Sequence, residues 1–465
     1  MKKWLLLLAV IASYTYAFGQ LPVAKVRTFG GNFTEEASEM ISTMDGGYAI
    51  IGMTGSTQSL NTDVMLIKLD ESLNCEWSQS YGGAGQDHGR SIKQLPDGSY
   101  ILIASSNSGP SSSYDVTVMR ITATGEVIWQ YYYGGSDWDF AVCSALSSDQ
   151  NTIWIGANTF SYGAGDQDAW VLQLSLDGEV ISELIAGDSF YDELTDMELD
   201  PSGNLWASGS KWTSVSEESA QAWLFEVTDD GTTQEFLYAQ SPGMELMDLD
   251  FKGTLMLGGM TFLEDGQRYA RLVRFNSDWG LQWSVDEYTQ WDLHVCQTPN
   301  WILTVSAGDT FGLGGVACHI FRRDLDSNWQ IGPAFGGTGD DVPVSMTYYP
   351  GGKVHLLGKS DSYSESGEMD VYLVEFQTDS IEAEYELDIL HNTCLPALGT
   401  DEPTQSDVAD FMGTECDFRV FSLSGQLMLQ DRRVISYADF TGWREPVLIV
   451  VHSRQGEMAL RKVFP

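Results

Sequence analysis

The chain has 465 residues, of which 66 are Asp or Glu and 24 are Lys or Arg, so its formal net charge is -42. This balance excludes nucleic acid as a partner, because binding to a phosphate backbone depends on clustered Lys and Arg. Apolar residues make up 43% of the chain, which excludes global disorder, and the 47 Gly favour short strands and tight turns over long helices.

The N-terminus has the order of residues typical of a secretory signal peptide. Lys2 and Lys3 precede an apolar run over 4–12, and small residues follow at Ala17 and Gly19. We therefore predict a signal peptide over 1–19, cleaved after Ala17 or after Gly19. No later segment reaches the roughly 18 uninterrupted apolar residues that a transmembrane helix needs. We expect a protein that is secreted or displayed on the outer cell surface, with no transmembrane segment.

An internal repeat follows. Its first mark is an aromatic-Gly-Gly block with an acid six positions after the aromatic residue, and these acids are Glu35, Asp87, Asp139 and Asp341. Its second mark is a polar residue at the start of an apolar run, as at Asp63, Asp115, Asp168 and Asp370, with degenerate copies at Gln221, Tyr269 and Ala317. The separations of the second mark are 52, 53, 53, 48, 48 and 53 residues, which makes seven copies.

A period near 50 residues with four short strand-like runs in each copy indicates a β-propeller. In the first copy the runs are 37–43, 48–54, 64–69 and 76–81. We predict an all-β fold, a seven-bladed propeller of four-stranded antiparallel blades over 20–390. The last copy runs on into 381–387, and the strand at 23–28 lacks a blade of its own. We expect this strand to complete the last blade and to leave no open sheet edge.

The loops between the second and third strands of each blade are long, and they share one face of the disc with the crossings between blades. They are 105–114, 160–168, 211–220, 262–269 and 360–370. Because function tends to lie on loops that a rigid scaffold displays, we predict that this face binds a ligand. Its candidate contact residues are the aromatics Tyr162, Trp212, Phe262 and Tyr363, which would stack on sugar rings or fill the blade interfaces.

The C-terminal segment differs from the propeller in charge. From Asp417 onward seven Lys and Arg stand against five Asp and Glu, a net charge of +2. A stretch without strand periodicity, 391–413, reads as a linker. Beyond it we predict a small β-sandwich-like domain over 414–465, with strands at 418–427, 447–456 and 458–464.

This segment resembles the type A C-terminal sorting domain of type IX secretion substrates of the Bacteroidota kind. The motif residues are Gly425, Gln426, Gly456, Lys462 and Val463, and the propeller blocks resemble repeats that often accompany such domains. The segment departs from the pattern of these sorting domains in two ways: it is short, and it lacks a Pro-Asn-Pro-like start. The resemblance implies the type IX machinery as a partner, passage from the periplasm through the outer membrane, removal of the tail, and release or surface attachment.

The repeated acids are candidate ligands for Ca²⁺, which prefers several oxygen atoms. The alternative is structural: Glu35, Asp87, Asp139 and Asp341 would accept backbone N–H bonds at tight crossings. The same alternative applies to Asp63, Asp115, Asp168 and Asp370. We expect no cofactor other than this Ca²⁺ candidate.

No enzymatic motif stands out. The chain has no His-Glu-x-x-His and no Gly-x-Ser-x-Gly, and its six His occupy unrelated repeat positions. His88, beside Asp87, is the one His on the predicted binding face that merits mutation. The six Cys leave their pairing open, and buried free thiols are the simplest interpretation for most of them.

Two functions from different classes follow. The first is a monomeric, non-enzymatic binding or adhesion module for an extracellular glycan or protein. The second is a polysaccharide-cleaving hydrolase or lyase that uses carboxylates on the long-loop face.

Overall fold

A computed structural model describes most of the chain. The described residues are 23–31, 33–55, 61–111, 113–227, 234–238, 241–252, 255–264, 267–276, 280–287, 291–299, 301–308, 316–323, 329–336, 339–364, 368–378, 386–392, 415–422, 427–434, 447–453 and 456–462. The expected signal peptide, with Ala17 and Gly19, lies outside this part of the chain. Within it, no helix is long and apolar enough to cross a membrane.

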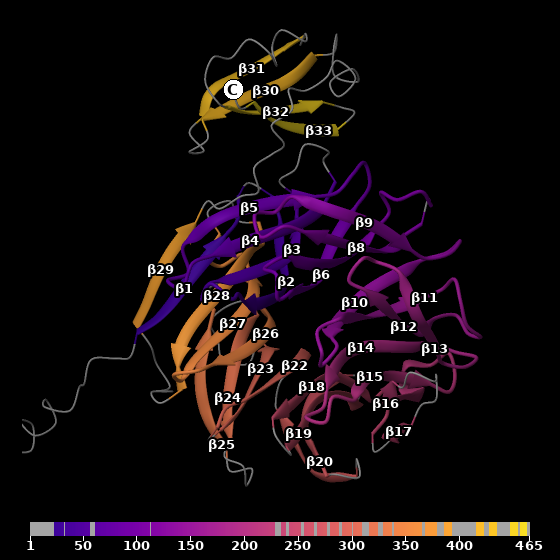
Figure 1. Ribbon diagram of the computed structural model, residues 1–465. Helices are drawn as coiled ribbons and strands as arrows, with labels where there is room; N and C mark the ends of the chain where they lie inside the picture. Colours follow the sequence, from indigo (N-terminus) through magenta and orange to yellow (C-terminus); the bar gives the residue numbers. More distant parts are fainter. Residues whose placement is uncertain are drawn as a thin grey trace, which may run out of the picture.

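Seven sheets are arranged around a common centre, as a β-propeller (Figure 1). The first three blades consist of β2 (Glu35–Ser42), β3 (Tyr48–Thr54), β4 (Asp63–Leu69) and β5 (Cys75–Tyr81); β6 (Asp87–Gln94), β7 (Tyr100–Ser106), β8 (Asp115–Ile121) and β9 (Val127–Tyr133); and β10 (Asp139–Leu146), β11 (Thr152–Thr159), β12 (Asp168–Ser175) and β13 (Val180–Ala186). The four runs predicted in the first copy are therefore confirmed as strands.

The next three blades follow the same order. They consist of β14 (Asp192–Leu199), β15 (Leu205–Trp212), β16 (Ala220–Val227) and β17 (Glu235–Tyr238); β18 (Glu245–Lys252), β19 (Leu255–Glu264), β20 (Gln267–Phe275) and β21 (Leu281–Glu287); and β22 (Trp291–Gln297), β23 (Ile302–Gly308), β24 (Ala317–Arg323) and β25 (Trp329–Phe335). A short 3-10 helix, η1 (Glu217–Ser219), precedes β16. The degenerate copies at Gln221, Tyr269 and Ala317 are thus third strands like the others.

Burial explains why the two middle strands of a blade are almost continuously apolar. Every residue of β7 is buried, and so is all of β8 except Arg120, whereas β9 is largely exposed. The middle strands pack against a neighbouring blade on each face, while the outermost strand faces solvent. A run without polar alternation, bounded by Gly and Asp, therefore marks a central strand.

The last blade closes the ring in the way the sequence predicts, and then continues. β1 (Val23–Phe29) pairs antiparallel with β28 (Asp370–Gln377), beside β27 (Lys353–Ser360) and β26 (Asp341–Tyr349). The expectation of no open edge is wrong, because β29 (Glu386–Asn392) adds outside β1 in parallel register. β28 and β29 run antiparallel to each other, so a short connection can carry the chain past β1.

Each innermost strand contains a β-bulge at the equivalent position. The register shifts lie between Ala37 and Glu39, Gly89 and Ser91, Ala141 and Cys143, Leu194 and Asp196, Leu246 and Asp248, Trp291 and Leu293, and Pro343 and Ser345. Because a bulge leaves one residue unpaired and bends its strand, it turns the following side chains toward the centre of the ring.

The described C-terminal residues form a separate sheet with the order β31-β30-β32-β33. Its strands are β30 (Glu415–Ser422), β31 (Leu427–Val434), β32 (Val447–Ser453) and β33 (Gly456–Lys462), all antiparallel. The sequence predicted three of them and missed β31. Within the described residues this is one four-stranded sheet rather than the two layers of a sandwich. Gly425, Gln426 and Val463 lie outside the described residues.

Candidate functional site

The repeated acids hold the crossings between blades. Gly83 N donates to Asp87 Oδ2 over 2.9 Å, and Gly135 N donates to Asp139 Oδ2 over 2.8 Å. The same bond joins Gly31 N to Glu35 Oε2 over 2.9 Å. These are the backbone hydrogen bonds that the structural alternative predicts. The carboxylates are buried, so they serve the crossing rather than the surface.

Two more acids, Asp341 and Asp192, lie at crossings between blades. Asp341 accepts hydrogen bonds from the hydroxyls of Ser360 and Ser362, at 2.5 and 2.6 Å. Asp192, which the repeat search missed, occupies the equivalent position in the fourth blade and accepts from the backbone N–H of Asp188. Burial raises the pKa of Asp192 to about 6. Among the described residues, no group of three or more His, Cys, Asp or Glu could hold a metal ion.

In the second and third copies the first Gly of the block packs closely against two carboxylates. A Cβ on Gly134 would lie 2.2 Å from Asp115 Oδ1 and 2.8 Å from Asp139 Oδ2. The Cα hydrogen of Gly134 therefore points at a carboxylate oxygen, as in a weak C–H···O contact. Asp115 is itself buried, and that burial raises its pKa. The aromatic-Gly-Gly block and the Asp of the third strand are thus two parts of one packing unit.

We expect Gly134→Ala to lower the free energy of unfolding by about 1–3 kcal/mol, because the added methyl group overlaps Asp115. Urea denaturation followed by tryptophan fluorescence measures this loss. In an Asp115→Ala background the same change should cost at least about 1 kcal/mol less, since the obstructing carboxylate is gone. Losses that simply add in the double variant would show that the overlap is not the cause.

The four aromatics predicted for the binding face have different surroundings. The Tyr162 and Tyr363 hydroxyls donate to Gly134 O and Gly336 O, at 2.8 and 2.7 Å, so both rings brace crossings. Phe262 is not in a loop: β19 and β20 extend into the range predicted as a loop, and Phe262 is buried in register opposite Tyr269. Only Trp212 belongs to a larger aromatic surface.

That surface is a continuous row of rings on the long-loop face, which we call the aromatic arc. Neighbouring ring centroids lie 5.2 to 6.4 Å apart along it. Its members come from crossings and loops of the second, third and fourth blades, and they are Tyr114, Trp138, Phe140, Phe160, Tyr191 and Trp212. Trp138 is 56% exposed and Tyr191 is 38% exposed, and the other rings are half-buried.

The repeat shows that the fold does not need aromatic residues here. At five crossings, the backbone N–H of the loop residue donates to the carbonyl of the residue before the crossing acid. The residue pairs are Thr34 and Gly55, Gln86 and Asn107, Trp138 and Phe160, Tyr191 and Trp212, and Asp340 and Asp361. Three of the five crossings use small or polar residues, so the fold accepts non-aromatic residues at these positions.

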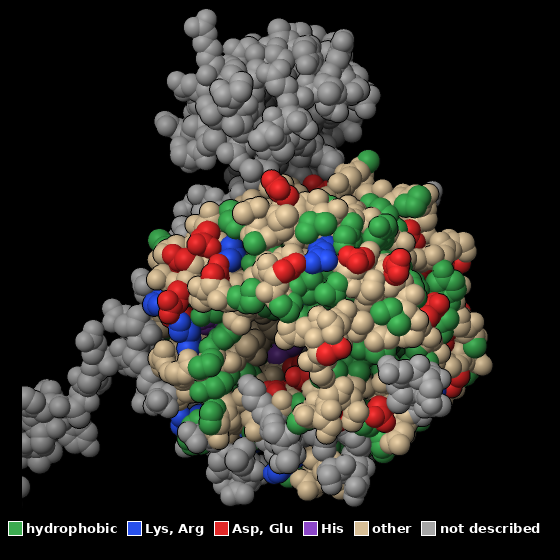
Figure 2. All heavy atoms as spheres, viewed as in Figure 1, with side chains coloured by type: hydrophobic (Ala, Val, Ile, Leu, Met, Phe, Trp, Pro, Cys, Tyr) green, Lys and Arg blue, Asp and Glu red, His purple; other side chains and the backbone are tan. Residues whose placement is uncertain are grey.

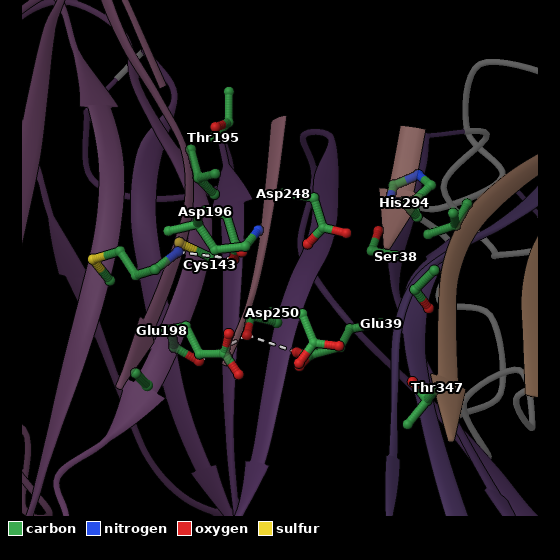
Figure 3. A pocket seen from close by; sticks show the side chains of 18 of the residues that line it. Ser38, Glu39, Cys143, Thr195, Asp196, Glu198, Asp248, Asp250, His294 and Thr347 are labelled. Atoms are coloured by element: carbon green, nitrogen blue, oxygen red, sulfur yellow. Dashed lines mark hydrogen bonds between the residues drawn. The ribbon is translucent and has the colours of Figure 1, made fainter. Parts of the chain in front are cut away.

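The second feature is the central channel, a cavity of about 650 Å³ that the innermost strands of all seven blades line. In the space-filling view, acidic and histidine side chains lie in the hollow near the middle of the disc (Figure 2). Figure 3 shows Asp196, Glu198, Asp248, Asp250 and Glu39 projecting into this cavity from their strands.

Each channel carboxylate accepts a hydrogen bond from the backbone of the next blade. Asp196 accepts from Leu249 N at 3.1 Å, and Asp248 accepts from Val295 N at 2.7 Å. In the same way Glu198 accepts from Phe251 N at 3.0 Å and Asp250 accepts from Gln297 N at 2.6 Å. Glu39 accepts from Ile92 N at 2.7 Å. The innermost strand is a sheet edge, so these carboxylates pair N–H groups that its own ladder leaves unpaired.

Burial and mutual repulsion perturb these acids. Burial raises the pKa of Asp196 to about 6. Burial and the charge of Asp196 raise the pKa of Asp248 well above its usual range. Burial and the charge of Asp250 do the same for Glu198. On the opposite wall Lys93 pairs with Glu39 at 2.6 Å. Asp196 and Glu198 occupy alternate positions of β14, and Asp248 and Asp250 occupy alternate positions of β18. This Asp-x-acid pattern is present in the sequence but was not among the predicted site residues.

The remaining candidates have ordinary surroundings. His88 is half-buried, and its Nε2 lies 2.8 Å from Thr62 Oγ1. Burial lowers the pKa of His88, and its ring lies 6.3 Å from Tyr114, at one end of the aromatic arc. Cys143 and Cys318 are free thiols, as the simplest interpretation predicts, whereas Cys75 is disulfide-bonded.

No protein-family model matches the chain. The regulatory protein FlaEY of Caulobacter vibrioides is 24% identical over 369 residues, a match that covers 73% of this chain and 37% of that protein. Among solved structures, the WD40 domain of Neurospora crassa Pan2 is 14% identical, with 74% of this chain and 90% of that chain covered and a TM-score of 0.46. Drosophila Plexin A in complex with Semaphorin 1b is 9% identical, with 77% and 88% covered and a TM-score of 0.47. At this distance the structural likeness extends to the propeller fold alone.

Proposed function

We propose that the protein is a secreted, non-enzymatic binding module that holds an extracellular ligand on the aromatic arc. The observation that carries this proposal is the replacement, in two adjacent blades, of residues that are small or polar at the other matched crossings. Exposed aromatic rings contribute large contact areas at a low cost in conformational entropy. Because backbone hydrogen bonds hold the crossings and loops together, the rings are positioned before any ligand arrives.

The test exchanges one aromatic pair for the pair that the second blade uses. In the chain from Gln20 onward, Trp138→Gln with Phe160→Asn should weaken binding to the best ligand of a glycan array and pull-down screen by at least about tenfold, equivalent to about 1.4 kcal/mol. The melting temperature should hardly change, because Gln86 and Asn107 already occupy the matched positions in this fold.

A suitable control is Tyr131→Ala. Tyr131 is 47% exposed on the outermost strand β9, away from the crossings, so its loss should leave binding unchanged. Equal binding by the wild-type protein and the arc variant would refute the assignment to this face. Release of reducing ends or unsaturated products from the bound glycan would instead favour the polysaccharide-cleaving alternative.

We further propose that the C-terminal segment directs export by type IX secretion and is then removed. The support is the resemblance of its motif residues, together with its reversed charge and its own sheet. Deleting 414–465 should leave propeller stability unchanged and retain most of the protein in the periplasm. Gly425→Val, a change at one of the motif residues of the resemblance, should have the same effect on export.

Cell fractionation with mass spectrometry of the extracellular product tests the export proposal. Normal export without the tail, or an intact tail through Pro465 on the extracellular protein, would contradict it. Either result leaves the binding proposal to its own experiment.

A further inference from the structure

We infer that the ligand of the aromatic arc is an uncharged chain of six-membered sugar rings, and that the arc discriminates against acidic polysaccharides. This inference rests on the proposed binding function and adds the chemical class of the ligand. Two independent features carry it: the extent of the aromatic surface and the charge around it.

The extent of the aromatic surface favours a ligand of several rings. Along the arc, centroids recur at 5.2 Å from Tyr114 to Phe140, at 6.1 Å from Phe160 to Tyr191 and at 5.6 Å from Tyr191 to Trp212, and most of the rings meet their neighbours edge to face. The exposed rings of Trp138 and Tyr191 can each contact the apolar face of a different sugar unit. A protein partner would instead concentrate its binding energy in a few central residues.

The charge excludes an anionic chain. Asp137 is exposed next to Trp138, and Glu193 is exposed after the buried Asp192. Asp139 is buried beneath the same crossing as Trp138. A uronate or sulfate group lying over the arc would therefore be repelled by these carboxylates.

Two basic residues near the arc do not offset this charge. Arg90, which interacts electrostatically with Tyr114, also interacts with the carboxylate of Glu36. Lys211, next to Trp212 in the chain, has a side chain that is only 14% exposed and lies near Asp188 and Glu235, at 3.8 and 3.5 Å. Its Nζ also lies 5.1 Å above the ring of Trp223. The ammonium group of Lys211 thus already interacts with residues of its own blade. The hydroxyls and amides of an uncharged glycan can donate hydrogen bonds to the acids around the arc without a charge penalty.

The experiment is isothermal titration of the chain from Gln20 onward with oligosaccharides of matched length. The neutral probes are cellohexaose, mannohexaose and xylohexaose, the anionic probe is hexagalacturonate, and the cationic probe is a chitosan hexamer. We expect at least one neutral probe to bind with an affinity that changes less than twofold between 50 and 500 mM NaCl. Hexagalacturonate should bind at least tenfold more weakly than that neutral probe.

Two variants locate the binding. Trp138→Gln with Phe160→Asn should weaken the neutral probe at least tenfold. Gln86→Trp with Asn107→Phe should extend the row of rings into the second blade and strengthen binding of the hexamer several-fold. Tyr131→Ala serves as the control, with unchanged affinity.

The outcomes separate the two proposals. If hexagalacturonate, the chitosan hexamer or a captured protein binds best, and the arc variant abolishes that binding, the arc is a binding site and the neutral-glycan inference is wrong. If a neutral probe binds but the arc variant has no effect, both the site and the inference fail.

Discussion

Val26→Asp should unfold the ring more readily than any other substitution considered for this protein. Val26 is fully buried in β1, between β28 and β29, in a cluster with Leu356, Tyr372 and Val374. An unpaired carboxylate there loses its hydration and gains no partner, so we expect a loss of about 4 kcal/mol or more in the free energy of unfolding. The melting temperature should fall by roughly 10 °C.

Val127→Asp is the matched control, because Val127 is 49% exposed on the outer strand β9. A substitution there should change stability by no more than about 0.5 kcal/mol. Removing 20–31 altogether should act in the same direction as Val26→Asp, since both β28 and β29 then lose their partner strand. Equal melting temperatures for the wild-type protein and the truncated chain would refute the role of β1 in ring closure.

The second large effect is a dependence of stability on pH that runs opposite to ordinary acid denaturation. The pKa values of Asp196, Glu198 and Asp248 are raised in the folded protein. Between about pH 4 and pH 7 the folded protein therefore binds more protons than the unfolded chain, and its free energy of unfolding should fall as the pH rises through this window. Chemical denaturation at pH 5 and pH 8 measures the difference.

The fall in stability with rising pH begins only near pH 4, because other acids have lowered pKa values in the folded protein and stabilise it as the pH rises from 2 to 4. Hydrogen bonds from His355 and Lys25 outweigh burial and lower the pKa of Glu375 to about 2. Asp45 has its pKa lowered to about 2 as well, first by its hydrogen bond with Thr43. These carboxylates stabilise the folded state above about pH 4 and lose that contribution as the pH falls toward 2.

Asp248→Asn isolates the channel contribution. The amide oxygen can still accept from Val295 N, while the charge next to Asp196 is gone. We expect a gain of about 1 kcal/mol in the free energy of unfolding at pH 8 and a flatter pH profile. Asp166→Asn, at an exposed position, removes the same charge and should leave the profile unchanged. A flattening of equal size in both variants would assign the effect to the net charge of -42.

Local patterns in the sequence were sufficient for the architecture. The Asp residues at the start of the third strands, such as Asp63 and Asp370, recur at fixed intervals because each blade is one supersecondary unit with the same turns. Counting them gives seven blades, and the unmatched run at 23–28 gives the closing strand. The acids of the crossings were also found from the sequence, because Glu35, Asp87 and Asp139 each accept from a backbone N–H only four residues earlier.

Only the tertiary structure decided what the ring brings together. β29 was not predicted as a fifth strand, because its parallel pairing with β1 has no counterpart in the four-stranded repeat of the other blades. Asp196 reaches Leu249 N, 53 residues later, and the aromatic arc joins Tyr114 to Trp212 across three blades. The period of apolar residues and the residue types of turns predict contacts only within a strand or a hairpin. The contacts of the channel and the arc arise from the radial packing of blades, which places equivalent positions of successive repeats side by side.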